Sequence, residues 1–343
     1  MKIKIIKAYS NLVNFKTLIK KELKSGFKIS FQKKLHCYAS GFLSESYIIY
    51  NFSKNKKSDY LSDFKRFIKT NQINFTNVKL LDNKLFFDRI FETEKYFIKA
   101  IAYVENGKVY SLNTSYNFPD IASLLLYAKE KSPLLIKPIT GGGGKGIIII
   151  NGKNPNYNEI KFKNILERGN YLIYNRFSQI GFSNLIFPSS LNTIRVLTMY
   201  DPYRNKPFIA AAVHRFGTSD SGYIDNWTAG GICADIDIST GKLSKAVQFP
   251  FRGKLNYYSE HPETFVKIEG KIIPEWKEIK DLALKLAKKM AFLPYIGWDF
   301  ILSGDEIFLL EANSNTDVNL LQVHKPLLIN DRIKKFYKYY GVI

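Results

Sequence analysis

The chain has 343 residues, of which 45% are hydrophobic and 15% aromatic, enough apolar material for a folded protein of two or three subdomains. No apolar run approaches the ~18–20 residues that a membrane-spanning helix requires, and the N-terminus lacks the continuous apolar segment of a secretory signal. Without an export signal, Cys37 and Cys233 are expected to be free thiols in a reducing cytosol.

The charge is strongly basic, with 51 Lys and Arg against 30 Asp and Glu and a formal net charge of +21. This excess favours anionic partners: nucleotides, phosphorylated or carboxylated substrates, acidic polymers or a membrane surface. Net charge alone does not identify which of these partners binds, and we expect that nucleic acid is not one of them.

The first 44 residues carry ten lysines and a single acid, Glu22. Apolar residues recur in this segment at helical spacing, at Leu12, Phe15, Ile19 and Leu23. Lysines line another face, at Lys16, Lys20 and Lys24. The commoner arrangement of such a helix is to pack on the domain with its lysines solvated. The alternative is a helix that lies on an anionic membrane surface.

Further along, the pattern predicts helices separated by polar turns over 56–91. Ser58 or Asp59 could cap the first of them, and Asp82 or Asn83 the last. A hairpin over 96–112 turns near 105–107, and a helix follows over 119–130.

The next stretch, "LLIKPITGGGGKGIIII", places four glycines and Lys145 between two apolar runs, the first of which carries Lys137. A Walker A loop is excluded, because Ile139 and Gly146 stand where Gly and Ser or Thr are required. A dinucleotide fingerprint must open a helix, whereas the isoleucine run 147–150 reads as a strand. The pattern therefore predicts a strand–loop–strand flap over phosphate. A flexible hairpin tip without a ligand is the alternative.

The second half alternates strands and helices. Strands are expected over 171–177, 193–200, 208–216, 232–238 and 245–249, with a polar loop at 217–231. Helices are expected near 157–167 and over 274–291, the latter opened by Pro274. The last predicted hairpin joins 295–302 to the strand that begins at 306 through a tight turn at 304–305.

Two carboxylates stand out in this last hairpin. Asp299 lies in one strand, and Glu311 and Asn313 lie two apart on the other, so both face the same way. Such an oxygen-only set suits Mg²⁺ bound to nucleotide phosphates. The alternative is that Asp299 and Glu311 form ion pairs with the abundant lysines. Because both lie in apolar strands, an unpaired carboxylate there would be costly.

The order of these features resembles the ATP-grasp superfamily: a lysine, a glycine hairpin, then Asp followed twelve residues later by Glu-x-Asn. More narrowly, it resembles the sugar-transfer-associated ATP-grasp proteins of bacterial surface-polysaccharide clusters, which are related to teichuronopeptide-type enzymes. The motifs that carry the resemblance lie between residues 40 and 325: "YNFSKNKKSDYLSDF", "DNKLFFDRIF", "SLNTIRVLTMYD", "HRFGTSDSGYIDNWTAGGICADID" and "HPET…G…IPEW".

The resemblance implies an α+β ATP-grasp fold, with the nucleotide held between two α+β lobes, after a mainly helical N-terminal region. The expected boundaries are 1–80 for that region and 81–178 for the central lobe with its flap at 141–146. The C-terminal lobe, 179–343, would carry the magnesium strand and a substrate loop.

The resemblance also implies roles for individual residues. Phosphate contacts would come from Lys84, Lys137, Gly141, Gly142, Gly143, Gly144 and Lys145, with Lys84 alternatively a surface lysine. The adenine contacts would come from the backbone around Ile173, Tyr174 and Asn175, where the usual hinge glutamate is missing. Arg195 and Arg215 would hold the transferred phosphoryl group, although either could be structural. A substrate carboxylate would meet the loop with Asp225, Asn226, Gly230 and Gly231, and Mg²⁺ would meet Asp299, Glu311 and Asn313.

The implied function is an ATP- and Mg²⁺-dependent carboxylate–amine ligase that forms an amide through an acyl phosphate. It would attach an amino acid or amine to a uronic-acid-containing sugar or glycan in capsule or O-antigen synthesis. Two alternatives stay open: an ATP-grasp kinase that phosphorylates a hydroxyl of an anionic substrate, and a non-catalytic polyanion-binding protein. The expected location is the cytoplasm, with attachment to the inner face of the membrane left open.

Overall fold

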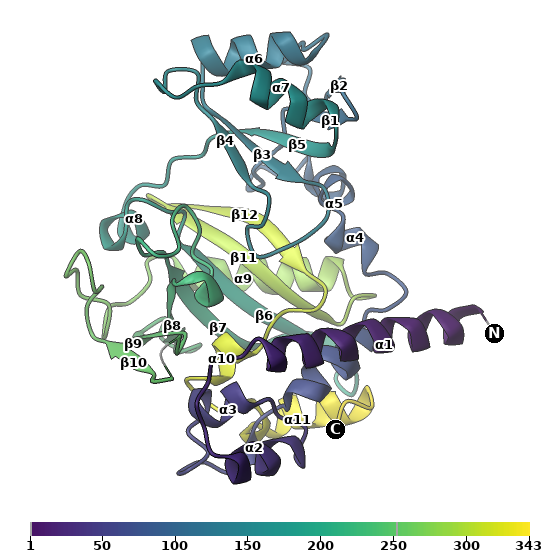
Figure 1. The fold of residues 1–343 in the computed structure, drawn as a ribbon, viewed down its shortest axis with the longest axis vertical. Coiled ribbons are helices and arrows are strands. Elements are labelled where there is room, and N and C mark those ends of the chain that lie inside the picture. The colour runs from purple at the N-terminus through teal and green to yellow at the C-terminus, as the bar shows by residue number, and fades with distance from the viewer. Residues whose placement is uncertain (1, 252) are drawn as a thin grey trace. The chain divides into compact units, whose positions relative to one another are not determined.

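The structure is a computed structural model that describes residues 2–251 and 253–343, with the backbone alone for residues 2–5. Two compact units divide the chain (Figure 1). The large unit comprises Met1–Val78, Ile180–Ile307 and Ala312–Ile343, and the small unit comprises Lys79–Gln179 with Phe308–Glu311.

The N-terminal part of the large unit is helical, as predicted. Its helices are α1 (Lys2–Leu23), α2 (Phe31–Tyr38), α3 (Ser44–Ile49), the 3-10 helices η1 (Lys57–Asp59) and η3 (Thr70–Gln72), and the π-helix η2 (Lys65–Lys69). The predicted cap at Ser58 or Asp59 is wrong, because both residues lie inside η1. Among the described residues, no helix is both long enough and apolar enough to cross a membrane.

A seven-stranded antiparallel sheet forms the centre of the large unit, in the order β10-β9-β8-β7-β6-β11-β12. The strands are β6 (Thr193–Asp201), β7 (Lys206–Phe216), β8 (Ile232–Ile236), β9 (Leu243–Gln248), β10 (Asn256–Tyr258), β11 (Tyr295–Ser303) and β12 (Glu306–Asn313). All but the short β10 were predicted. The central strands are apolar and buried on both faces, so their few charged residues must find partners inside the sheet layers.

Helices cover this sheet. The helix α9 (Trp276–Lys289) contacts β6, β7 and β11 through its apolar side and begins two residues after Pro274. The C-terminal helix α11 (Asp331–Tyr339), capped by the Asn330 side chain, contacts β6; the sequence pattern had not indicated it. The remaining elements are α8 (Phe182–Ile186), η4 (Trp227–Ala229), α10 (Asn319–Gln322) and η5 (Leu327–Ile329).

The small unit is a five-stranded antiparallel sheet with helices. Its strand order is β2-β1-β5-β3-β4. The strands are β1 (Ala102–Glu105), β2 (Lys108–Ser111), β3 (Leu134–Pro138), β4 (Ile148–Ile150) and β5 (Asn170–Asn175). The helices are α4 (Lys79–Asp82), α5 (Lys84–Phe91), α6 (Ile121–Glu130) and α7 (Glu159–Glu167). The predicted cap at Asn83 is confirmed, since its side chain accepts from Leu85 N and Phe86 N at the start of α5.

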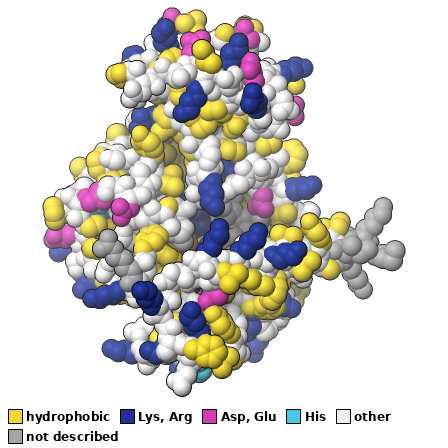
Figure 2. All heavy atoms as spheres, in the orientation of Figure 1, with side chains coloured by type: hydrophobic (Ala, Val, Ile, Leu, Met, Phe, Trp, Pro, Cys, Tyr) yellow, Lys and Arg dark blue, Asp and Glu magenta, His cyan; other side chains and the backbone are white. Residues whose placement is uncertain are grey.

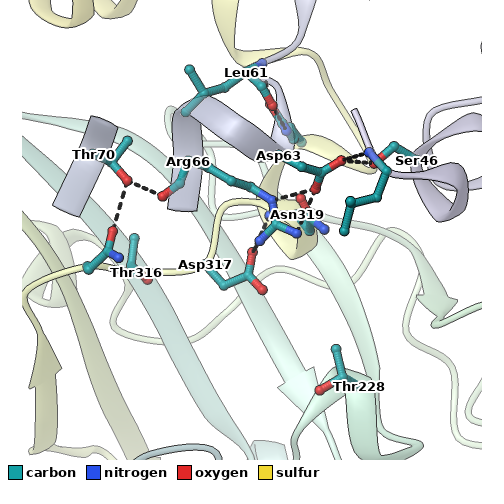
Figure 3. A network of polar contacts seen from close by, with 12 residues as sticks. Ser46, Leu61, Asp63, Arg66, Thr70, Thr228, Thr316, Asp317 and Asn319 are labelled. Atoms are coloured by element: carbon teal, nitrogen blue, oxygen red, sulfur yellow. Dashed lines mark hydrogen bonds and ion pairs between the residues drawn. The ribbon is translucent and has the colours of Figure 1, made fainter. Parts of the chain in front are cut away.

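A polar network around the buried Arg66 in the large unit joins the N-terminal helices to the loop after β12 (Figure 3). Arg66 donates to Asp63 and to Asp317, each at 2.8 Å, and Thr70 donates to Asn315 at 2.9 Å. A buried guanidinium is costly unless carboxylates and hydrogen bonds surround it. These contacts therefore fix residues 314–319 against η2 and η3, although the two segments are about 250 residues apart in sequence.

Candidate active site

In the small unit, Lys137 lies on β3, between β5 and the edge strand β4, and is only 7% exposed. On β3 it stands two residues from Leu135, whose partner across the strand pair is Tyr174 on β5. Lys137 and Tyr174 are therefore diagonal neighbours on one face, and the ammonium lies 5.0 Å from the centre of the Tyr174 ring. Burial raises the pKa of Tyr174 well above its usual value, and the nearby Asp88 and Glu311 raise it further. Tyr174 is thus a neutral ring beneath a buried cation.

The glycine segment joins two strands, as predicted. β3 and β4 pair antiparallel, with Leu134 opposite Ile150 and Ile136 opposite Ile148. Within the connection, positive φ angles occur at Gly141, Gly143, Gly144 and Gly146. Such angles strain any residue with a Cβ, so the segment needs these glycines to turn as it does.

Lys84 contacts this same segment. Its ammonium donates to the carbonyl oxygen of Gly141 at 2.6 Å, and its backbone amide donates to Ile139 O at 2.8 Å. The lysine that the resemblance assigned to phosphate therefore lies at the base of the predicted flap, at the first turn of α5. From this position the Lys84 ammonium could leave the Gly141 carbonyl oxygen and donate to a phosphate oxygen instead.

We expect Gly142→Val to weaken ATP binding by about tenfold without lowering the melting temperature. Gly142 has no positive φ, and a Cβ there would meet nothing within 4 Å, so the protein itself tolerates the side chain. Only a ligand drawn close to the backbone would be displaced. Gly26→Val is the matched control, because Gly26 also has no positive φ and open space around its Cβ. Calorimetric titration measures the affinity, and ATP affinity equal to that of the unaltered protein would exclude phosphate contact at Gly142.

The predicted hinge strand β5 is already hydrogen-bonded on both sides. The carbonyl oxygen of Ile173 accepts from the Ile101 amide at 2.8 Å. Asn175 accepts from the Tyr127 hydroxyl at 3.1 Å and donates to the Tyr116 hydroxyl at 2.9 Å. The backbone around Ile173 and the Asn175 amide are therefore held in place by the small unit itself.

In the large unit, Arg195 and Asp299 form a forked ion pair. Arg195 on β6 stands directly opposite Asp299 on β11. Its Nε and Nη2 donate to the two carboxylate oxygens, with Nη2 2.7 Å from Oδ2. Its Nη1 donates to Thr316 Oγ1 at 2.6 Å. Arg195 is 5% exposed and Asp299 is fully buried, so two carboxylate oxygens and one hydroxyl oxygen fix the guanidinium plane away from solvent.

A second arginine joins this pair from β7. Arg215 Nη2 lies 3.2 Å from Asp299 Oδ2, and Arg215 Nε lies 3.5 Å from Asp225 Oδ2. Arg215 Nε also donates to Thr193 Oγ1 at 2.9 Å, and the Thr193 amide donates to Asp225 at 2.8 Å. Burial raises the pKa of Asp225, while Arg215 and the Thr193 hydrogen bonds lower it in part.

Four of the predicted site residues thus come together in the large unit: Arg195, Arg215, Asp225 and Asp299. Two arginines balance two aspartates in this arginine–aspartate cluster. An incoming phosphate dianion would compete with the aspartates for guanidinium donors that are already oriented. Sequence reasoning missed Thr193 and Thr316. Thr193 could have been found, because it is two residues from Arg195 and so shares its strand face.

The predicted substrate loop is tightly packed. The Asn226 side chain caps η4, and the amides of Gly230 and Gly231 donate to Trp227 O at 3.4 Å and Asn226 O at 3.1 Å. A Cβ on Gly230 would lie 2.6 Å from Asp220 Cβ, so the glycine permits a close approach. A substrate carboxylate could not take these two amides without opening the turn.

The predicted magnesium residues have different surroundings. Glu311 and Asn313 are half-buried on β12, whereas both oxygens of Asp299 accept from Arg195. The ion-pair alternative therefore holds for Asp299, with arginine in place of lysine. Across residues 2–251 and 253–343, no group of three His, Cys, Asp or Glu side chains is arranged to hold a metal ion.

Glu311 and Asn313 on β12 are better suited than Asp299 to bind a cation that prefers oxygen ligands. A carboxylate and an amide oxygen are ligands that Mg²⁺ accepts. Asn313 Nδ2 is buried and has no hydrogen-bond partner within the described part of the chain. This N–H group is a donor, so water or an anionic oxygen would satisfy it, whereas a cation would be bound by Asn313 Oδ1. Asp299 fits the cation only if Arg195 or Arg215 moves from the carboxylate to another anion.

One family model and several solved structures are similar to this chain. The family model of sugar-transfer associated ATP-grasp matches residues 64–338. Among solved structures, the biotin carboxylase of Campylobacter jejuni has a TM-score of 0.45 at 13% identity over 81% of this chain and 53% of its own. VanG D-Ala:D-Ser ligase of Enterococcus faecalis has a TM-score of 0.41 at 13% identity, over 75% of this chain and 61% of its own.

This chain covers little more than half of those two solved proteins. No curated protein matches it significantly. The family match extends over most of the chain and includes Lys84, Lys137 and the whole arginine–aspartate cluster. The predicted α+β ATP-grasp fold is confirmed, and the chain belongs to the sugar-transfer associated ATP-grasp family.

Proposed function

We propose that this protein is an ATP-dependent carboxylate–amine ligase that attaches an amino acid or amine to a uronic-acid-containing sugar or glycan. A carboxylate oxygen attacks the γ-phosphorus of ATP, the bond to ADP breaks, and an acyl phosphate forms. An amine then attacks the acyl carbon, phosphate leaves, and the amine loses a proton as the amide forms. Membership of an ATP-grasp family supports ATP as the nucleotide, and the family's association with sugar transfer supports a sugar or glycan as the acceptor.

The observation that carries this proposal is the arginine–aspartate cluster. Negative charge spreads over the oxygens of a phosphoryl group in transfer, and fixed guanidinium forks stabilise it where water is excluded. Asp299 and Thr316 hold Arg195 in one orientation, and Thr193 and Asp225 do the same for Arg215. The guanidinium groups are therefore oriented before the phosphoryl group arrives, and its oxygens would replace carboxylate oxygens of the aspartates as acceptors. No enzyme nucleophile is required.

Other residues would bind the nucleotide. Lys137, held over Tyr174, and Lys84, at the glycine segment, supply ammonium groups for phosphate oxygens. Glu311 and Asn313 would hold Mg²⁺, which when bound neutralises phosphate charge. Asp299 would join that ligand set only as Arg195 turns to the phosphoryl group.

The reaction is tested by trapping its intermediate. With ATP, Mg²⁺ and a panel of uronic-acid saccharides and amino acids, we expect phosphate release that depends on the acid. Hydroxylamine in place of the amine attacks an acyl phosphate and gives a hydroxamate, which mass spectrometry detects. A phosphoester of a substrate hydroxyl, found in place of the hydroxamate, would show a kinase. Tight binding of the saccharide without any nucleotide turnover would show a polyanion-binding protein.

A further inference from the structure

The first helix packs on the large unit through polar side chains. The residues of α1 that are buried or half-buried recur along one side: Lys7, Ser10, Asn11, Asn14, Leu18, Lys21 and Glu22. Asn11 accepts from Gln72 at 2.9 Å, Lys21 pairs with Glu45 at 2.6 Å, and Glu22 accepts from the Ser44 amide at 2.9 Å. Leu18 is the one buried apolar side chain among residues 6–23.

The apolar residues of α1 face away from the protein. Leu12, Phe15, Ile19 and Leu23 are 50%, 46%, 45% and 81% exposed, at spacings of three and four that place them along one side of a helix. Lys16, Lys20 and Lys24 are exposed beside them. Figure 2 shows apolar and basic side chains together along α1. We call these seven residues the α1 stripe.

This orientation is opposite to the commoner arrangement expected from the sequence, in which the apolar side packs on the domain. A surface helix of a globular protein normally buries its apolar side. Here hydrogen bonds and ion pairs hold the polar side inward, so contiguous apolar surface remains exposed. Exposed patches of this kind mark interaction surfaces.

We propose that the α1 stripe binds an anionic membrane surface, with α1 lying in the plane of the interface. The 22 residues of α1 would extend about 33 Å along the surface at 1.5 Å per residue. In interfacial helices, apolar side chains insert into the membrane surface, and the lysines beside them contact anionic headgroups. This inference concerns attachment and is independent of the proposed ligase reaction.

Charge favours this occupant over a second copy of the chain. Residues 1–44 contain ten lysines, and their single acid, Glu22, is turned inward to Ser44 and Tyr38. Two α1 stripes packed together would bring lysines against lysines with no carboxylate between them. Anionic headgroups supply the negative charge that this face lacks.

Vesicle sedimentation with the full chain tests the proposal. At low salt we expect binding to vesicles of phosphatidylcholine with 30% phosphatidylglycerol, and at least tenfold weaker binding to pure phosphatidylcholine. Lys16→Gln/Lys20→Gln/Lys24→Gln should lower the partition coefficient on the order of 100-fold, since each lysine near an anionic surface contributes about fivefold. Phe15→Glu/Ile19→Glu should reduce binding to background.

The matched control is Ile272→Glu/Phe292→Glu, which changes two apolar residues that are 61% and 53% exposed elsewhere on the large unit. This control should bind within twofold of the unaltered protein. Unchanged melting temperatures would show that the variants are folded. Equal binding to neutral and anionic vesicles, or none to either, would overturn the proposal. So would a dimer, seen by analytical ultracentrifugation, that Phe15→Glu/Ile19→Glu abolishes.

Discussion

Arg195→Lys is expected to slow hydroxamate formation at least about 100-fold while changing ATP affinity by less than about threefold. Lysine keeps the charge but cannot form the fork that holds Asp299 through Nε and Nη2 or reach Thr316 as Nη1 does. Loss of one oriented donor to a developing oxyanion typically costs 10²–10³ in rate. Because the stabilised charge develops only during transfer, the ground-state affinity for ATP should change little.

Lys137→Met should show the opposite pattern, with ATP binding weakened at least tenfold, because its ammonium would contact phosphate already in the ground state. Arg332→Lys is the matched control for the arginine change, since Arg332 forms an arginine–aspartate pair with Asp201 at 2.7 Å elsewhere in the large unit. It should leave the rate unchanged. Single-turnover trapping and calorimetry separate rate from affinity.

Arg195→Lys also disturbs a buried ion pair, so its melting temperature must be compared with that of the control. Thr316→Val offers a milder change, because it removes the acceptor of Arg195 Nη1 and leaves the fork to Asp299. An unmet buried donor costs about 1–3 kcal/mol, and we expect roughly a tenfold lower trapping rate. Normal trapping in both variants would assign Arg195 a purely structural role.

Glu311→Gln is expected to lower Mg²⁺-dependent ATP turnover on the order of 1,000-fold. The substitution keeps the shape of the side chain and removes one negative charge from a half-buried position on β12. A neutral amide is a weak ligand for a hard dication, and metal neutralisation of phosphate charge contributes several kcal/mol to transfer. The apparent Mg²⁺ concentration for half-maximal turnover should rise accordingly.

The same strand provides the control for this variant. Glu306 is exposed at the start of β12, so Glu306→Gln removes the same charge without touching the proposed ligand set. We expect its Mg²⁺ titration to match that of the unaltered protein. If Glu311→Gln also matches it, Glu311 is no metal ligand, and the assignment of Asn313 beside it loses its basis.

Local patterns in the sequence determined most of the secondary structure and the strand–loop–strand form of the glycine segment. Strand alternation and turn residues act over a few positions, so they can be read without the fold. The same holds for Lys137, whose place in an apolar run already indicated burial. Motif order then indicated the ATP-grasp family, because the distances between these motifs along the chain are characteristic of it.

Tertiary structure alone decided which charges meet. Arg195 and Asp299 are 104 residues apart, and only the β6–β11 register places them opposite each other. The pairing of β6 with β11 therefore gives Asp299 an arginine partner that could not be identified from the residue types alone. The orientation of α1 is a second case. Its sequence contains both an apolar and a polar face, and the choice between them depends on Glu45, Gln72 and Ser44, residues that lie outside the helix. Helical periodicity defines faces, whereas the energies of burial and pairing with distant residues decide which face turns inward.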